Sequence, residues 1–479
     1  MIQHAGPTTT RLTLRSKFIY GLGDWGTSAA TTARNLFWLF FLVSVVGIAP
    51  NVAGTVILVG KVWDAVNDPL IGMVSDRVRT RWGRRRPFLL FGAFPIGLAF
   101  FFLFFVPPVH SQTGLAVYYG TVILLFDTLF TVVNVPYAAL TPELTEDYDE
   151  RSSLAGWRMA TSILAALVTG ASFKLLAETT FGPWLAGLGL VSGRGNSLQA
   201  GYSLTAALWS VMLILPPLIL FKAIREPARQ PDPDPIQPWR NFREVFSNRP
   251  FRLAATIYLL SFATVDLIVA VFLWFLVYYM RVRPGFDSVI LAVVLGLAFV
   301  SMPLVVKLMH RFGKRNTYMG AMLVFAIVMY ILAQVPPGGE RQLLAAAVFA
   351  SLGYGAANAI PWAIVADVIE EDELKTGKRR EGLYTGYLVL FRKLGGAVAV
   401  FVVGQVLAAR GFISSTAGST VFIQQPAAAL DALRFFVGVA PALMLFLSIL
   451  AAWRYPLDRR AHDEIRQQLA QRRAAQAEG

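Results

Sequence analysis

The sequence of 479 residues contains no cysteine and only four histidines. Without cysteine, the chain can form neither disulfide bonds nor thiolate metal sites. His4, His110, His310 and His462 all fall in tails or near the ends of apolar runs, which argues against a buried haem or histidine-ligated metal centre. We therefore predict no cofactor. Charged residues are also scarce, at 15% of the chain, whereas 56% is hydrophobic and the mean hydropathy is +0.55. This balance indicates an integral membrane protein.

Apolar runs long enough to cross a bilayer recur along the whole chain. We predict about twelve transmembrane helices, each about 20 residues long. Their predicted starts lie near Phe18, Val52, Phe88, Val117, Leu154, Tyr202, Ala254, Val289, Tyr318, Leu343, Tyr384 and Phe435. The segment before Phe18 lacks an apolar core followed by a small-residue cleavage site, so we predict no removable signal peptide.

The net charge of +14 is concentrated in short connections between the apolar runs. The connection 76–87 contains six arginines, whereas the connections 49–53 and 107–115 contain no lysine or arginine. The positive-inside bias therefore predicts that the arginine-rich loop and both termini are cytoplasmic. We expect the membrane to be a bacterial inner membrane. Because this bias accounts for the basic residues, we do not predict nucleic-acid binding.

Two motifs recur at similar offsets, which indicates internal duplication. "RWGRRRPF" at Arg81 is similar to "RFGKRNTY" at Arg311, an offset of 230, and "NVPYAAL" at Asn134 is similar to "AIPWAIV" at Ala359, an offset of 225. The proline-rich, charged segment 225–250 is predicted to be a cytoplasmic linker. We therefore predict two six-helix halves, residues 1–224 and 251–457, and a cytoplasmic tail, residues 458–479.

Several polar side chains fall deep inside the predicted spans, where an ionised group is a functional candidate. They are Asp24, Asp64, Asn67, Asp68, Thr131, Asn134, Arg158, Asp266 and Lys393. Asp64, Asn67 and Asp68 stand at i, i+3 and i+4, so they share one helical face. Their oxygens suit a hard cation, and a threonine hydroxyl from a neighbouring helix could add another ligand.

The alternative is that these polar groups only hydrogen-bond helices together, a role that suits a lone Asn67 or Thr131. Two carboxylates four residues apart repel each other in lipid, so Asp64 and Asp68 favour a cation or proton site. With both ionised, one bound Na⁺ leaves the pair at −1. Lys393, followed by Gly395 and Gly396 that permit close helix approach, is a candidate partner.

Five motifs together resemble one transporter family. They are "GLGDWG", "WDAVNDPLIG", "RTRWGRRRPF", "NVPYAALTPELTEDYDERSSLAGWRM" and "IPWAIVADVIEEDELKTGKRREG". They are similar to those of the glycoside-pentoside-hexuronide:cation symporter family of the major facilitator superfamily, from about Tyr20 to about Phe412. The resemblance implies an all-α membrane fold of twelve helices in two six-helix halves and secondary active symport by alternating access.

The resemblance also implies site residues. The cation site falls on Asp64, Asn67, Asp68 and Thr131, and the sugar site on Asp24 and Arg158, with Lys393 near both. The cytoplasmic gate of the family consists of charged loops. The gating candidates are Arg81, Glu143, Asp149, Arg151, Asp367, Arg379 and Glu381, although charged loops are often simply solvated.

The sequence departs from the melibiose-transporting members of that family at the sugar site. Asn134 replaces a sugar-contacting aspartate, Gly23 replaces a lysine, and Ala138 replaces an aromatic residue, with Tyr137 adjacent. The cation set is intact. We therefore predict a monomeric symporter of a sugar or glycoside, with substrate contacts from Asp24, Asn134, Tyr137, Arg158 and Lys393. A lysophospholipid or other amphipathic solute is the alternative.

Other protein classes remain as alternatives. A membrane-embedded glycosyltransferase would need a catalytic domain, a phosphate-binding glycine-rich loop or a nucleophile-base pair, and the sequence offers none of these, so we predict no enzyme and no catalytic residue. A receptor or channel would be distinguished by counterflow measurements. The coupling ion is Na⁺ or H⁺, because paired carboxylates can also share a proton.

Overall fold

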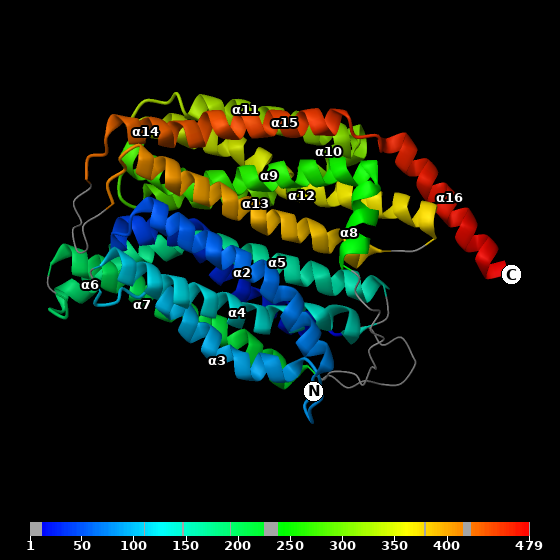
Figure 1. Cartoon of the computed structure of the whole chain (residues 1–479), viewed down its shortest axis with the longest axis horizontal. Helices are drawn as coiled ribbons and strands as arrows, with labels where there is room; N and C mark the ends of the chain where they lie inside the picture. Colours follow the sequence, from blue (N-terminus) through cyan, green and yellow to red (C-terminus); the bar gives the residue numbers. More distant parts are fainter. Residues whose placement is uncertain are drawn as a thin grey trace. The chain divides into compact units, whose positions relative to one another are not determined.

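Helices form almost all of the regular structure. The computed structural model describes residues 12–109, 111–145, 148–191, 193–224, 238–377, 380–414 and 423–478. Its α-helices, most of them labelled in Figure 1, are α1 (Leu14–Ala33), α2 (Pro50–Arg77), α3 (Arg86–Leu103), α4 (Gln112–Leu144), α5 (Tyr148–Leu175), α6 (Gly182–Gly187), α7 (Arg194–Ala223), α8 (Pro238–Ser247), α9 (Arg249–Trp274), α10 (Phe286–Phe312), α11 (Lys314–Leu332), α12 (Glu340–Thr376), α13 (Glu381–Ala409), α14 (Ala427–Arg434), α15 (Ala440–Trp453) and α16 (Arg459–Glu478).

Each predicted span coincides with a helical segment. In the described parts of the chain, five π-helical stretches extend or join neighbouring α-helices: η1 (Arg34–Trp38), η2 (Phe41–Val46), η3 (Leu176–Phe181), η4 (Phe275–Tyr279) and η5 (Phe435–Val439). Gly47, at φ 91°, ends the first segment in a left-handed conformation that glycine adopts without strain. Among the described residues, ten helical segments are long and apolar enough to cross a membrane. The segment α1 to η2 and helix α2 are not among those ten, and α2 carries Lys61, Asp64 and Asp68.

The helices divide between two compact units. Unit 1 comprises the described residues of 1–233, 283–292 and 404–429, and unit 2 comprises those of 234–282, 293–403 and 430–479. In unit 1, α1 packs against α5 and α7, α2 against α4, and α3 against α4 and α7. Aromatic side chains fill this core, where Phe37 stacks on Phe173 and the Trp38 indole donates a hydrogen bond to the carbonyl of Leu103. The pairing of α2 with α4 sets the geometry of the site described below.

Unit 2 is built around α9, α11, α12 and α15. Helix α12 packs against α9 and α11, and α15 packs against the same two helices. Buried tyrosines join them by hydrogen bonds, since Tyr318 pairs with Ser261 at 2.5 Å and the Tyr455 hydroxyl donates to the carbonyl of Ile364. The predicted boundaries of the two sequence halves stay predictions.

Part of the predicted linker 225–250 is helical. Residues 225–237 lie outside the described residues, but α8 covers Pro238–Ser247, and Asn248 caps α9 by accepting a hydrogen bond from the Phe251 amide. Helix α8 is amphipathic, and its Phe242 and Phe246 rings pack against Tyr387 of α13. The apolar residues of α8 are few and alternate with charged residues, so they do not form a run long enough to predict a transmembrane helix. The sequence pattern therefore indicates only a polar connection.

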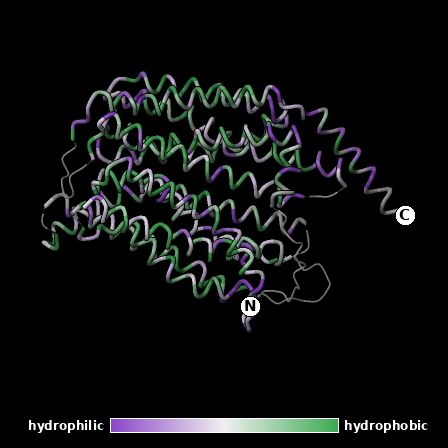
Figure 2. Tube along the Cα trace, in the orientation of Figure 1, coloured by the Kyte–Doolittle hydropathy of each residue, from purple (hydrophilic) through white to green (hydrophobic). Residues whose placement is uncertain are grey.

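The chain ends in an exposed polar helix, α16. Figure 2 shows hydrophobic residues along the long helices, whereas α16 is largely hydrophilic. The predicted tail, residues 458–479, is therefore helical over Arg459–Glu478.

Candidate functional site

The acidic face of α2 is buried against α4 in unit 1. Asp64 and Asn67 are 5% and 3% exposed, and Asp68 is half-buried. Their spacing places them on one side of the helix, as predicted, because residues three and four apart are neighbours on a helix. The face that carries both carboxylates therefore points into protein.

Helix α4 supplies the partners of this face. The Thr131 hydroxyl, 1% exposed, donates a hydrogen bond of 2.8 Å to Oδ1 of Asp68. The Asn67 side-chain amide lies 3.4 Å from the backbone carbonyl of Asp127, to which it donates. The structure thus brings all four predicted cation-site residues, Asp64, Asn67, Asp68 and Thr131, to the contact between α2 and α4.

The donor set consists of oxygen groups and fits a small hard ion. It offers two carboxylates, an amide oxygen and a hydroxyl, which are the ligand types that hard cations prefer. Within the described residues, no three histidine, aspartate or glutamate side chains are grouped so that they could hold one metal ion.

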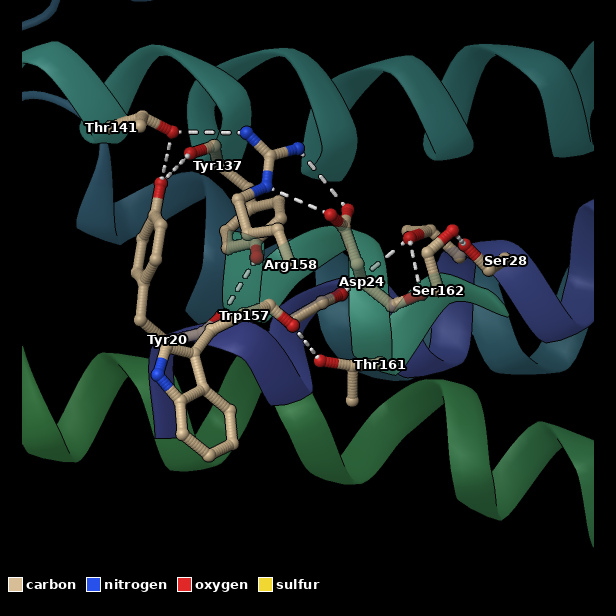
Figure 3. Close-up of polar contacts among 11 residues, drawn as sticks. Tyr20, Asp24, Ser28, Tyr137, Thr141, Trp157, Arg158, Thr161 and Ser162 are labelled. Atoms are coloured by element: carbon tan, nitrogen blue, oxygen red, sulfur yellow. Dashed lines mark hydrogen bonds and ion pairs between the residues drawn. The ribbon is translucent and has the colours of Figure 1, made fainter. Parts of the chain in front are cut away.

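A second polar centre, in the same unit, joins α1 to α5 (Figure 3). The Arg158 guanidinium donates to both carboxylate oxygens of Asp24, with Nε to Oδ2 at 2.8 Å and Nη2 to Oδ1 at 3.2 Å. The side chains are 21% and 14% exposed. Paired donors and acceptors of this kind can bind hydroxyl groups, which both donate and accept.

Helix α4 holds the Arg158 guanidinium from its other side. Nη1 of Arg158 donates to the Thr141 hydroxyl at 2.9 Å, and the guanidinium carbon lies 4.7 Å from the centre of the Tyr137 ring. The Tyr137 hydroxyl donates to the carbonyl of Tyr20, whose own hydroxyl pairs with Thr141 (Figure 3). Contacts from two helices, α1 and α4, therefore fix the orientation of the Arg158 side chain on α5.

Gly23 makes room for Tyr137 in this centre. A Cβ atom at Gly23 would lie 2.3 Å from the Tyr137 ring, closer than real Cβ contacts. We expect Gly23→Ala to displace the ring from Arg158 and to destabilise the protein by about 1–3 kcal/mol, as overpacking does. Thermal unfolding in detergent measures the loss. Gly156→Ala is the matched control, because a Cβ there meets nothing within 4 Å; equal effects of the two substitutions would contradict this account.

The two remaining substrate candidates lie on different units. Asn134 is half-buried on α4 in unit 1, three residues after Thr131. Lys393 is half-buried on α13 in unit 2, and its association with the residues of unit 1 stays a prediction. Gly395 and Gly396 do permit close helix approach, since Cβ atoms there would lie 2.5 Å from Leu259 and 2.2 Å from Asp266 on α9.

The gating candidates are only partly described. Arg379 lies outside the described residues, and the side chains of Glu143, Asp149 and Arg151 are also outside them. Arg81 is exposed and stacks on Trp82, and Glu381 is exposed at the start of α13. Asp367, 4% exposed, pairs with Lys314 and with His462 of α16, whose Nε2 lies 3.1 Å away.

Sequence reasoning missed several charged partners near these loops. Lys17 and Glu150 form a buried ion pair of 3.0 Å at one end of unit 1. In unit 2, Arg380 bridges Asp372 at 2.7 Å and Glu244 at 2.9 Å. The hydrogen bond to Asp372 raises the pKa of Arg380 further above its usual value, so the guanidinium stays charged at any physiological pH. Nothing in the local sequence indicates these partners.

A buried ion pair deep in unit 1 was also missed. Arg34 of η1 pairs with Asp127 of α4, and the side chains are 9% and 1% exposed. Both residues interrupt apolar runs, so the criterion that selected Asp24 and Asp64 could have found them. The pair belongs to the surroundings of the α2 acidic face, because Asp127 also interacts electrostatically with Asp64 and Lys61.

Comparison with known proteins gives a consistent set of relatives. A family model described as MFS/sugar transport protein matches residues 19–459. An uncharacterized symporter of Synechocystis is 32% identical and is matched over 96% of this chain and 97% of its own length. A putative glycoside/cation symporter of Escherichia coli is 25% identical, with 98% and 97% covered. A sodium-dependent lysophosphatidylcholine symporter of Danio rerio is 25% identical, with 96% and 88% covered.

Solved structures share the arrangement of helices. A bacterial homologue of the human lysosomal transporter Spinster superposes with a TM-score of 0.64 at 17% sequence identity, covering 92% of this chain and 96% of the other. At this identity the likeness concerns the fold alone.

Proposed function

The chain belongs to the MFS/sugar transport protein family, whose model spans nearly its whole length, and we propose that it couples uptake of a sugar or glycoside to entry of one cation. It is an integral membrane transporter of the symporter type. We further propose that it works as a monomer in a bacterial inner membrane, with both termini cytoplasmic.

The observation that supports coupling most directly is the buried α2 face. Asp64 and Asp68 lie in the second predicted span, and Thr131 of another helix donates to Asp68 at 2.8 Å. Two ionised carboxylates so placed repel each other, and Asp64 is also shielded from solvent, so a bound cation or proton stabilises them. The site therefore favours a state in which an ion is present.

The second polar centre supports a hydroxylated substrate. Asp24 offers acceptors and Arg158 offers donors, and Tyr137 presents a ring beside them. In the proposed cycle, the ion binds on the α2 face and favours the conformation that binds substrate. The two halves then move so that the loaded sites open to the other side of the membrane. By linkage, the substrate then tightens ion binding by the same factor.

A second solute class is favoured by one feature and one relative. Ala138 leaves a small side chain where the melibiose-transporting proteins carry an aromatic ring, and the Danio rerio relative is named for lysophosphatidylcholine transport. A larger amphipathic solute is therefore the second candidate substrate.

Uptake into proteoliposomes tests the proposal. Purified protein is reconstituted and exposed to a panel of labelled glycosides and lysophospholipids under a Na⁺ gradient, a pH gradient or neither. We expect accumulation of one solute class under one gradient, and counterflow of that solute without a gradient. Gradient-independent product formation would instead indicate an enzyme, and flux without counterflow would indicate a channel.

A further inference from the structure

Five charged side chains surround the contact between α2 and α4 in unit 1: Arg34, Lys61, Asp64, Asp68 and Asp127. Two are cationic and three are anionic, so their formal charges sum to −1 when all are ionised. One monovalent cation neutralises that sum. The cluster as a whole, rather than the Asp64 and Asp68 pair alone, therefore matches a single coupling ion.

We propose that the Arg34–Asp127 pair sets the charge of the coupling-ion site by keeping the Arg34 guanidinium away from Asp64. This inference rests on the proposed cation coupling and extends it to two residues that act on the site without binding the ion. Asp127 is thus a positioning residue. It holds the Arg34 guanidinium, which would otherwise pair with Asp64 and take the place of the coupling ion.

The location of the pair supports this role. Asp127 lies one helical turn before Thr131 on α4, and its backbone carbonyl accepts from Asn67. Its carboxylate also approaches α2, because a Cβ atom built on Gly60 would lie 3.2 Å from Oδ2 of Asp127. Gly60 precedes Asp64 by one turn, so Arg34 is held within electrostatic reach of the ion site.

The Arg34–Asp127 ion pair also leaves two of its polar atoms without hydrogen bonds in the described part of the chain. Nε of Arg34 and Oδ2 of Asp127 are buried and have no hydrogen-bond partner among the described residues. A buried guanidinium without an anion is very unfavourable, so Arg34 must find another carboxylate if Asp127 is neutralised. Asp64 is the neighbouring carboxylate that already interacts electrostatically with Asp127.

Charge-altering variants test the inference through ion binding, which needs no knowledge of the substrate. Binding of radioactive Na⁺ to the purified full-length protein is measured against a choline chloride background. In Asp127→Asn the formal charge of the five-residue cluster becomes 0, and Arg34 loses its ion-pair partner. We therefore expect Na⁺ binding to weaken at least about tenfold. In Arg34→Met/Asp127→Asn the formal charge of the cluster returns to −1, so we expect the affinity for Na⁺ to lie within about threefold of the wild-type value.

The double variant separates this role from a structural one. If the ion pair only held η1 to α4, removing both charges would not rescue what removing one had lost. Asp127→Asn binding like wild type, or the double variant binding no better than Asp127→Asn, would overturn the inference. Asp127→Glu, which keeps the charge, is expected to stay close to wild type.

The proposed function can fail separately. Asp68→Ala binding Na⁺ like wild type would overturn the cation site itself, whereas a defective Asp68→Ala beside an unaffected Asp127→Asn would overturn only the role of the pair. If wild type takes up a proton in place of Na⁺, the same variants are compared by proton uptake on acidification, with the same order of effects expected.

Discussion

Replacing Asp68 by alanine is expected to abolish accumulation of substrate against its gradient. The substitution removes one of the two carboxylates of the α2 face and the acceptor of the Thr131 hydrogen bond. With one carboxylate left, the Asp64 side chain can be balanced by neighbouring positive charge, so the need for a bound ion disappears. Uptake driven by an ion gradient in proteoliposomes measures the loss, and counterflow without a gradient shows whether the substrate site survives.

Asp431→Ala is a matched control for Asp68→Ala. Asp431 lies on α14 with its side chain 70% exposed, so its removal should leave uptake unchanged. Gradient-driven accumulation at the wild-type level in Asp68→Ala would reject the assignment of the α2 face as the coupling-ion site. If both counterflow and accumulation are lost, the variant is misfolded or has lost its substrate site.

Replacing Arg158 by glutamine is expected to abolish substrate binding and also to destabilise the fold. Arg158 makes two hydrogen bonds to Asp24, a third to Thr141 and a stacking contact with Tyr137. Removing it leaves the carboxylate of Asp24 largely buried without a counter-charge, a change that typically costs about 3–5 kcal/mol. Thermal unfolding in detergent and counterflow in vesicles measure the two effects.

A double variant distinguishes the two contributions of Arg158. In Asp24→Asn/Arg158→Gln no charge is left unpaired, so we expect stability to recover toward wild type while transport stays absent. Arg158→Lys retains the charge but cannot make the paired contacts of a guanidinium, so we expect weaker substrate binding with less loss of stability. Transport by the double variant at the wild-type level would show that the pair is structural and lies outside the substrate site.

The helices and the shared face of the α2 residues could be predicted from the sequence, whereas the partner of each buried charge could not. The twelve helical segments follow from long apolar runs, and the predicted all-α major facilitator fold is confirmed by the family match and by the superposition with solved transporters. The shared face of Asp64, Asn67 and Asp68 follows from helical periodicity alone. In contrast, Arg34 and Asp127 are each visible as a charge in an apolar run, but nothing in their sequence positions indicates that they meet.

The difference has a physical origin. Hydropathy and helical spacing are properties of one segment, so the amino-acid sequence is enough to predict that this chain spans a membrane, where its helices lie and which side chains share a face. Partnership between helices depends on which helices are neighbours and on their relative register, and these arise from packing across the whole unit. Only the packed fold therefore shows that Thr131 donates to Asp68, that Arg158 is held between Asp24 and Tyr137, and that Asp127 pairs with Arg34.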